Sequence, residues 1–538
     1  MRSNRWLPYG LAALLAVLVS LNTLSGEFVY DDLTYVQGNP SVLGEKGVFT
    51  EPAAPLLETL GLYRPLTVLT YRWNARLGGL EPLPFHLVNV LLHALASLLV
   101  VSLAAHCGAS RFVAGLAGML FAAHPVHVEA VAWIVGRAEI LATILAILAI
   151  LAHGRPGDRR PVARAWLGAL LFAAAALAKE SALCLPAFFL LRDLLSRPAV
   201  PARRILLRLL PAVTACLALV LVRFLVLGRF GPDVSADPFL GGLPLGERAL
   251  LGLAVIGKAL RLMVVPQPAS VYYLPTSMMT SQAALLGLLF AIPVLALAVF
   301  WRRRSRDTGL LGLVLGAVGL LPFLHLIPIG AVFGDRFLYL PSAGFCVALA
   351  CLLMAGSSGT PGTEGTRGAL RLLIAGSILL LFSGLTVRRN PVFAAPIPLW
   401  EEAVAYEPDA AIPHYQLAHF YKEVGLLEYE GENRKGAIFH FLESLRLGPG
   451  LLHAAAAHLA LGEYAAARLR DAAGAAAHHR ASLQINPNQV DALLDLAALY
   501  PSGVVTRQAT EEMLEKAMRL DPDERQREAV RQLRLLFE

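Results

Sequence analysis

Residues 86–105 read HLVNVLLHALASLLVVSLAA, a run of twenty residues without a single Asp, Glu, Lys or Arg. A helix rises about 1.5 Å per residue, so a run of this length spans the roughly 30 Å hydrocarbon core of a bilayer. The whole chain is 56% hydrophobic and only 16% charged, with a mean hydropathy of +0.59. A water-soluble protein of this composition has too little polar surface to cover its apolar residues. The sequence therefore predicts an integral membrane protein.

Similar apolar runs bring the prediction to about eleven spans. The other ten are 7–24, 111–129, 138–153, 163–179, 181–196, 206–227, 283–300, 309–327, 337–355 and 370–387. The first run follows Arg2 and Arg5 and lacks a small-residue cleavage site, so we expect a retained helix that also directs export. One further stretch, 249–265, carries Lys258 and Arg261 and is predicted to be re-entrant or interfacial.

Clusters of arginine set the orientation of these spans. They lie at the N-terminus and at 155–164, 192–208, 302–306 and 367–371. Placing all of them in the cytoplasm satisfies the positive-inside rule. We therefore expect a multi-pass protein whose N-terminus is cytoplasmic, whose first loop, 25–84, is external, and whose C-terminal tail is extracytoplasmic.

The tail differs from the rest of the chain because it is rich in Ala, Glu and Arg and reads like an ordinary soluble domain. Prolines that follow similar helical segments recur 41, 38 and 35 residues apart, at Pro408, Pro449, Pro487 and Pro522. This spacing is close to the tetratricopeptide period of about 34 residues. The predicted fold class is all-α: a polytopic membrane helix bundle over 1–387, followed by an α-solenoid of tetratricopeptide-type repeats over 388–538.

Two adjacent carboxylates, Asp31 and Asp32, follow the first span within a few residues of the bilayer surface. Neighbouring like charges at low dielectric raise one of the two pKa values. A carboxylate in such a place suits a general base, or a ligand for a divalent metal such as Mg²⁺ or Mn²⁺. A helix cap or a loop turn is the structural alternative for the pair.

The second span carries His86, Asn89 and His93, which recur at i, i+3 and i+7 and so share one helical face. A single histidine is more often a packing residue than a ligand. Three polar groups in one stripe favour a lined cavity.

The connection between the third and fourth predicted spans, 124–139, holds two His, two Glu and an Arg. If a helix continues after Pro125, Glu129 and Arg137 lie on one face and are one or two turns apart. A zinc site made of His124, His127 and Glu129 lacks the usual helical spacing of metal ligands. Charge pairing across a cavity is therefore the preferred interpretation.

More charged residues fall at the ends of predicted spans on the external side, among them Lys179, Glu180 and Arg336. The guanidinium fork of arginine offers two hydrogen bonds to a phosphate group together with a compensating charge. Interfacial snorkelling explains any one of these residues equally well. Their convergence on one side of the membrane favours a binding site.

Six ordered motifs give the chain a family resemblance. They are FVYDD at 28–32 with NP at 39–40, YRPLT at 63–67, FHLVN at 85–89 with LH at 92–93, HPVHVEAV at 124–131 with VGRAE at 135–139, AKE at 178–180, and RFLYLPS at 336–342. In this order they resemble the transmembrane and tetratricopeptide repeat-containing (TMTC) family. The Ala-rich composition, with Arg used far more than Lys, is typical of a GC-rich bacterial genome, so we expect a bacterial inner-membrane protein.

That family is similar to the GT-C glycosyltransferases, such as protein O-mannosyltransferases. The resemblance implies transfer of a sugar, mannose or similar, from a polyprenyl or dolichyl phosphate carrier to an external acceptor, a protein Ser/Thr hydroxyl. It implies that Asp31 or Asp32 is the catalytic carboxylate. We expect the substrate-binding residues to be Arg64, His86, Asn89, His93, His127, Glu129, Arg137, Glu139, Lys179, Glu180 and Arg336. The tail would present an acceptor polypeptide, and a folding or oligomerisation module is its alternative.

Other functions are weighed against this one. A non-catalytic membrane-anchored scaffold for envelope assembly is the main alternative. A transporter would favour internal repeats of broken helices, which the sequence does not show clearly. Nucleic acid is not expected as a partner, because the basic residues, 46 against 39 acidic ones, are not interleaved with aromatic residues. The five cysteines include no CxxC pair, so neither a zinc site nor a disulfide framework is indicated.

Overall fold

The structure, a computed structural model, describes residues 5–50, 62–155, 157–229, 242–267, 269–304, 307–327, 331–355, 365–424 and 436–537. Every regular element within these ranges is helical. The all-helical class predicted from the apolar runs is therefore confirmed. The chain forms two compact units, Met1–Leu399 and Trp400–Glu538, which are described separately.

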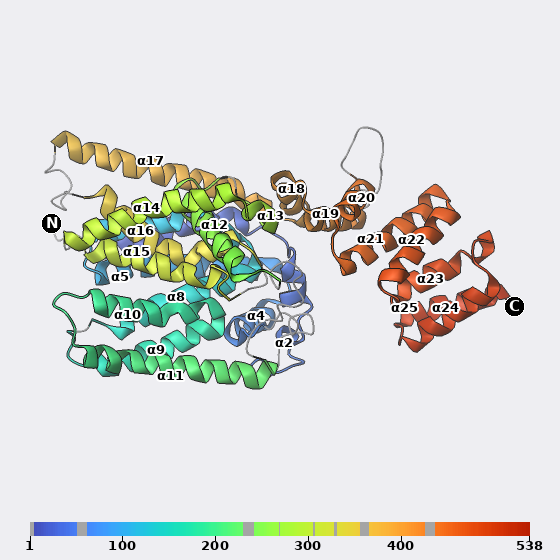
Figure 1. The fold of residues 1–538 in the computed structure, drawn as a ribbon, viewed down its shortest axis with the longest axis horizontal. Coiled ribbons are helices and arrows are strands. Elements are labelled where there is room, and N and C mark those ends of the chain that lie inside the picture. The colour runs from blue at the N-terminus through green and yellow to red at the C-terminus, as the bar shows by residue number, and fades with distance from the viewer. Residues whose placement is uncertain are drawn as a thin grey trace. The chain divides into compact units, whose positions relative to one another are not determined.

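The first unit is a bundle whose longer helices run roughly along one direction (Figure 1). Its helices are α1 (Leu7–Ser20), α2 (Pro40–Leu43), α4 (Pro65–Gly78), α5 (Pro82–His106), α6 (Arg111–Ala123), α7 (Val128–Ala132), α8 (Arg137–His153), α9 (Pro161–Ala178), α10 (Leu185–Leu195), α11 (Ala202–Leu227), α12 (Leu245–Val264), α13 (Pro275–Met278), α14 (Ser281–Arg303), α15 (Asp307–Leu320), α16 (Tyr339–Leu353) and α17 (Gly365–Arg389).

Local sequence signals explain where several of these helices begin. Helices α4, α5 and α9 each start with a proline, whose fixed φ suits the first helical position and whose missing N–H would have no partner there. The side chain of Ser110 accepts from the N–H of Val113 at the start of α6. Thr280 accepts from Ala283 at the start of α14 in the same way. Each signal marks the residue at which a helix begins.

Glycines let two pairs of helices approach closely inside the bundle. A Cβ added to Gly287 of α14 would lie 2.1 Å from the carbonyl oxygen of Leu253 in α12. A Cβ on Gly344 of α16 would lie 2.3 Å from the carbonyl oxygen of Gly312 in α15. Small residues at helix crossings allow this backbone contact, which stabilises helix packing where the hydrophobic effect cannot act between helices.

The described residues contain 7 helices that are long and apolar enough to cross a membrane, or 8 if the bent pair α6 and α7 counts as one span. These agree with the predicted spans 86–105, 111–129, 138–153, 163–179, 206–227, 283–300, 337–355 and 370–387. The predicted spans 7–24 and 309–327 correspond to shorter apolar helices, and 181–196 contains the 11-residue α10. Of the stretch 249–265, all residues but the last lie within one unbroken helix, α12, which ends at Val264. The apolar helices support an integral membrane protein, and the count of eleven stays a prediction.

The second unit consists of short helices. They are α19 (Ala411–Glu423), α20 (Ala437–Leu447), α21 (Leu451–Tyr464), α22 (Ala472–Ile485), α23 (Val490–Ala498), α24 (Arg507–Arg519) and α25 (Glu524–Arg534), while α18 (Pro396–Tyr406) crosses the boundary between the units. Consecutive helices pack on one another, as α19 does on α20 and α21 on α22. Helices α18, α20, α22 and α24 each end two or three residues before one of the four prolines that recur in the tail.

Candidate functional site

Asp32 is fully buried, and both of its carboxylate oxygens are occupied. Oδ2 accepts from the backbone N–H of Val29 at 3.1 Å, and Oδ1 accepts from that of Val135 at 2.8 Å. Burial raises the pKa of Asp32 well above its usual range, while these two N–H groups act in the opposite direction. Asp32 therefore joins the loop after α1 to the segment before α8.

Asp31 has a different environment although it is the next residue. It is half-buried, and its carboxylate makes no hydrogen bond or ion pair within the part of the chain that the structure describes. Burial raises the pKa of Asp31 to about 6, against the opposing influence of the Arg336 and Arg64 guanidinium groups. Its carboxyl group can therefore gain or lose a proton close to neutral pH.

The backbone beside Asp31 is held by aromatic contacts. Tyr30 has a φ of +50°, which is uncommon for a residue with a large side chain. Its ring stacks on Trp133 with 5.7 Å between the ring centroids, and the indole N–H of Trp133 donates to the carbonyl of Val29 at 3.2 Å. These contacts offset the cost of the strained backbone and fix the direction of the loop.

The condition that a helix continues from Pro125 through Arg137, under which Glu129 and Arg137 would lie on one face, is not met. Helix α7 ends at Ala132, Trp133 has an extended backbone, and a 3₁₀ turn, Ile134–Gly136, leads into α8. A continuous helix would direct the N–H of Val135 to a carbonyl four residues earlier, but Asp32 accepts it instead. The break separates Glu129 from Arg137, so the two side chains do not share one helical face.

Arg137 and Asn89 are packed inside the protein. The guanidinium of Arg137 is completely buried and donates to the side-chain oxygens of Asn89 and Asn74 and to the carbonyl of Phe85, at 2.8, 2.6 and 2.8 Å. The amide nitrogen of Asn89 donates to the carbonyl of Trp133 at 3.1 Å. The guanidinium of Arg137 therefore bonds only to neutral groups among the described residues.

Glu129 pairs with Arg336, which precedes α16. One carboxylate oxygen accepts from the backbone N–H of Arg336 at 2.9 Å, and the other accepts from its Nη1. The guanidinium lies 5.0 Å from the ring centroid of Trp133 and 4.9 Å from that of Phe337. Cation–π contacts on two rings and a carboxylate bond orient this guanidinium.

Two further ion pairs lie close to this one. Arg64, the residue before α4, donates through Nε to Oε2 of Glu180 at 2.9 Å and through Nη2 to Oε1. The ammonium of Lys179, which follows α9, pairs with Glu139 of α8, and both side chains are almost completely buried. The predicted charge pairing thus occurs, with partners that the local sequence does not specify.

The charges of these residues act on one another at one end of the first unit. Asp31 is affected by Arg336, Arg64 and Glu129, and Lys179 is affected by Arg64 and Arg336 as well as by Glu139. We call this group the charged cluster; its members are Asp31, Arg64, Glu129, Glu139, Lys179, Glu180 and Arg336. Parts of the chain that are far apart in the sequence contribute to it: helices α7 and α8, the segments before α4 and α16, and the segments after α1 and α9.

The predicted histidines lie outside the charged cluster and are buried between helices. His93 bonds through Nδ1 to the hydroxyl of Tyr339 at 2.7 Å, and His127 bonds through Nε2 to the hydroxyl of Ser342 at 2.7 Å. His86 is buried as well and has no hydrogen bond to a described residue. The stripe on α5 therefore faces protein, and His93 and His127 connect α5 and the turn before α7 to α16.

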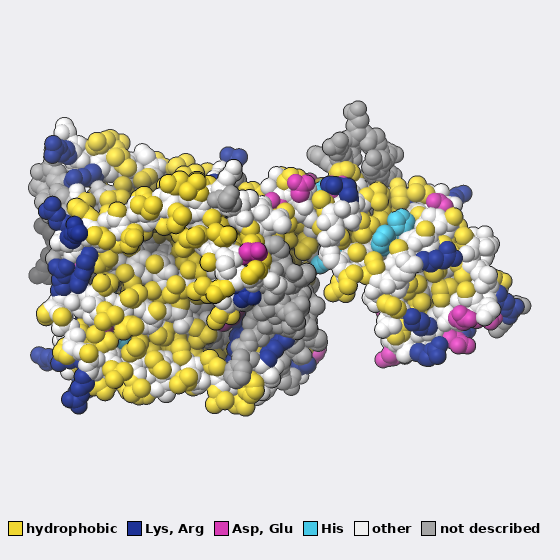
Figure 2. Space-filling view, viewed as in Figure 1, with side chains coloured by type: hydrophobic (Ala, Val, Ile, Leu, Met, Phe, Trp, Pro, Cys, Tyr) yellow, Lys and Arg dark blue, Asp and Glu magenta, His cyan; other side chains and the backbone are white. Residues whose placement is uncertain are grey.

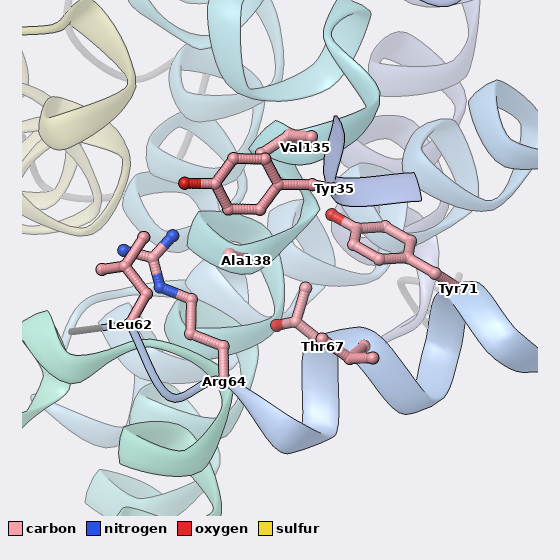
Figure 3. Close-up of a pocket in the computed structure, with 8 residues that line it drawn as sticks. Tyr35, Leu62, Arg64, Thr67, Tyr71, Val135 and Ala138 are labelled. Carbon is pink, nitrogen blue, oxygen red and sulfur yellow. The ribbon is translucent and has the colours of Figure 1, made fainter. Parts of the chain in front are cut away.

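A small pocket, lined in part by Arg64 of the charged cluster, is shown in Figure 3. It is lined by Tyr35, Leu62, Arg64, Thr67, Val68, Tyr71, Val135 and Ala138. The hydroxyl of Tyr35 and the guanidinium of Arg64 point to the same side of this pocket in Figure 3. Sequence reasoning missed Tyr35, Tyr71 and Asn74, because neither charge nor spacing distinguishes them from ordinary loop and helix residues.

The residues around Asp31 do not form a metal site of the usual kind. The described ranges contain no group of three or more His, Cys, Asp or Glu side chains arranged to hold a metal ion. Both oxygens of Asp32 are occupied by N–H groups, and the charges that act most strongly on Asp31 are those of two guanidinium groups. This donor set does not fit a divalent cation, which needs several oxygen ligands and is repelled by nearby cations.

Comparison with known proteins gives relatives over much of the chain. No protein-family model matches. Human protein O-mannosyl-transferase TMTC1 is 29% identical over 504 residues, which cover 82% of this chain and 55% of the human protein. Protein O-mannosyl-transferase Tmtc2 of Drosophila melanogaster is 43% identical over 187 residues, or 31% of this chain and 20% of that protein. The chain thus spans about half the length of the human relative.

Among solved structures, the apo form of the Archaeoglobus fulgidus oligosaccharyltransferase aligns with 83% of this chain and 64% of that chain, at 14% identity. Its TM-score is 0.44, a weak likeness. The sequence relatives have the stronger similarity, and they are O-mannosyl-transferases of the TMTC type from human, mouse and fly. These relatives confirm the resemblance of the chain to the transmembrane and tetratricopeptide repeat-containing family.

Proposed function

We propose that this protein is a membrane glycosyltransferase that moves a sugar, mannose or similar, from a polyprenyl or dolichyl phosphate carrier to a Ser/Thr hydroxyl of a protein. The observation that carries the proposal is the environment of Asp31, a carboxylate that has no hydrogen bond or ion pair to a described residue and that is affected by the guanidinium charges of Arg64 and Arg336. The names of the relatives, protein O-mannosyl-transferases, supply the reaction class.

In this proposal Asp31 is the general base. The acceptor hydroxyl oxygen attacks the anomeric carbon of the sugar, and the bond from that carbon to the phosphate oxygen breaks. Asp31 takes the hydroxyl proton, and the carrier phosphate leaves with the bonding electrons, so the anomeric configuration inverts. A pKa of about 6 leaves most of the carboxyl ionised at neutral pH and keeps it basic enough to accept a proton. Asp32 supports the loop and does not take part in proton transfer.

Arg336 and Arg64 are the proposed phosphate ligands. Arg336 uses Nη1 for Glu129, so its Nε and Nη2 remain without a hydrogen bond to a described residue. Arg64 uses Nε and Nη2 for Glu180, and its Nη1 has no hydrogen bond to a residue that the structure describes. Guanidinium groups held in place by carboxylates need little reorganisation to stabilise the charge that develops on the departing phosphate.

The membrane arrangement supports this assignment. In Figure 2 many of the Lys and Arg side chains of the first unit gather at one end of it. Helix α8 begins at Arg137, near the charged cluster, and ends at His153, just before the arginines at 155–164. The cluster and these arginines therefore lie at opposite ends of α8. With the basic end in the cytoplasm, the N-terminus is cytoplasmic and the cluster faces the external side of a bacterial inner membrane.

The tail is part of the same proposal. Residues 1–387 form the membrane domain with its first external loop at 25–84, and 388–538 form an extracytoplasmic array of tetratricopeptide-type repeats that presents the acceptor polypeptide. The recurring prolines after α18, α20, α22 and α24 support a repeat array.

Transfer of labelled sugar tests the function directly. The purified full chain would be incubated with a panel of labelled polyprenyl phosphate sugars and Ser/Thr peptides, beside the Asp31→Asn variant. We expect transfer from at least one donor, and a loss of about 10²- to 10⁴-fold in the variant. No transfer by the wild type with any donor, or an unchanged rate in Asp31→Asn, would instead favour the membrane-anchored scaffold.

A further inference from the structure

Arg137 has the chemistry of a phosphate ligand but not the accessibility of one. Its side chain is 0% exposed, whereas that of Arg336 is 19% exposed. Its donors are directed to Asn89, Asn74 and the carbonyl of Phe85, so a phosphate could bind only after these bonds break. A second role fits the contacts better.

The turn between α7 and α8 is bonded from two sides. From one side, the amide nitrogen of Asn89 donates to the carbonyls of Trp133 and Ile134, at 3.1 and 3.3 Å. From the other side, the Asp32 carboxylate accepts from the N–H of Val135 at 2.8 Å. The turn thus lies between the Asn89 side chain of α5 and the carboxylate of Asp32, the residue next to Asp31.

Arg137 completes this arrangement by holding Asn89. Its Nε–H donates to Oδ1 of Asn89, which leaves the amide nitrogen directed at the turn. The guanidinium also lies 4.8 Å from the ring centroid of Tyr71, and Asp32 is a carboxylate whose charge acts on it. A chain of contacts therefore runs from Arg137 through Asn89 and the turn to Asp32.

We propose that Arg137 and Asn89 are positioning residues that fix the turn at 133–136 and, through Asp32, the place and direction of the Asp31 carboxylate. This inference rests on the proposed function, because it concerns how Asp31, the proposed general base, is held in position. Displacement of a catalytic group by about 1 Å reduces the rate by as much as about 10²-fold, even when the changed residue never touches the substrate.

The test compares two lysine substitutions of buried arginines. Arg137→Lys keeps the charge but loses the fork that reaches Asn89 and Asn74. Arg208→Lys is the matched control, because Arg208 is also 0% exposed and bonds to Asp193 and to the carbonyl of Gly154 in the region of the α8–α9 connection. We expect both variants to lose thermal stability.

The kinetic readouts separate positioning from donor binding. In Arg137→Lys we expect kcat to fall about 10- to 100-fold with KM for the donor within about twofold, and the acid limb of the pH profile to move to lower pH as Asp31 becomes more hydrated. Asn89→Asp, which keeps the acceptor for Arg137 but removes the donor to the turn, should show the same pattern. A raised donor KM with kcat unchanged, or an equal change in kcat and pH profile in Arg208→Lys, would overturn the inference.

Amide hydrogen exchange provides a readout that does not need activity. Peptides covering 28–36 and 131–136 should exchange faster in Arg137→Lys and Asn89→Asp than in the wild type, and at the wild-type rate in Arg208→Lys. If the wild type transfers no sugar, the proposed function fails and exchange alone decides the structural link. Unchanged exchange in both segments in Arg137→Lys would refute that link.

Discussion

Replacing Asp32 by Asn should destabilise the first unit because Asp32 accepts two buried hydrogen bonds. Asparagine has the same shape, but its amide nitrogen replaces one of the oxygens that accept from Val29 and Val135. One buried N–H then faces another donor, and an unsatisfied group of this kind costs about 1–3 kcal/mol. For the unit Met1–Leu399, such a loss lowers the midpoint of thermal unfolding by roughly 1–4 °C.

Asp31→Asn is the matched control at the neighbouring position. The Asp31 carboxylate has no hydrogen bond to a described residue, so the substitution removes none, and it also removes a charge that burial disfavours. We expect its unfolding midpoint to equal or exceed that of the wild type. Both variants would be purified in the same detergent at pH 7.5, and unfolding followed by tryptophan fluorescence, to which Trp133 beside Val29 contributes.

The comparison of the two midpoints decides whether the two carboxylates have separate tasks. Equal midpoints in both variants, or a larger fall in Asp31→Asn, would show that the difference in hydrogen bonding between the neighbours does not govern stability. The assignment of Asp31 as the free carboxylate would then be wrong.

Three further predictions concern the pH dependence of transfer, the packing of α12 on α14 and the stability of the second unit. The rate of transfer should rise with pH through a midpoint near 6, because Asp31 acts when deprotonated. Arg336→Gln should move that midpoint to higher pH, because the Arg336 charge is the one that most lowers the pKa of Asp31. A pH–rate profile measures both. Gly287→Val should lower the unfolding midpoint by forcing α12 and α14 apart, at a cost of about 1–3 kcal/mol, while Gly376→Val, which meets nothing within 4 Å, should not. Burial lowers the pKa of His440 to about 4, so the second unit should lose stability as the pH falls from about 6.5 toward 4; His440→Gln should lessen this loss in unfolding scans of the full chain at several pH values.

The helical class and most apolar helices follow from the sequence because a spanning run is a local property. Its length and lack of charge depend on no other segment. The break at Trp133 could not be predicted in this way, because the group that takes the N–H of Val135 is Asp32, 103 residues earlier in the chain. The local pattern was compatible with a continuous helix there, and the bond to a distant carboxylate is not visible in it.

The candidate site shows the same division. The residue types of the charged cluster were predicted, since charges at span ends are visible in the sequence. The pairing of these residues was not predicted, because Glu129 bonds to Arg336, which lies 207 residues later in the sequence. Nothing in the sequence separates Asp31 from Asp32, or indicates that Arg137 is enclosed while Nε and Nη2 of Arg336 have no hydrogen bond within the described ranges.

The bond between Asp32 and Val135 also constrains biosynthesis. A chain is made from its N-terminus, so the loop with Asp31 leaves the ribosome long before Val135 exists. Until α5 and α8 have been inserted and the turn before α8 has formed, the loop lacks its contacts with Phe85, Trp133 and Val135. If Asp31 is the base proposed above, its position is therefore completed late, and chains that end before α8 should be inactive.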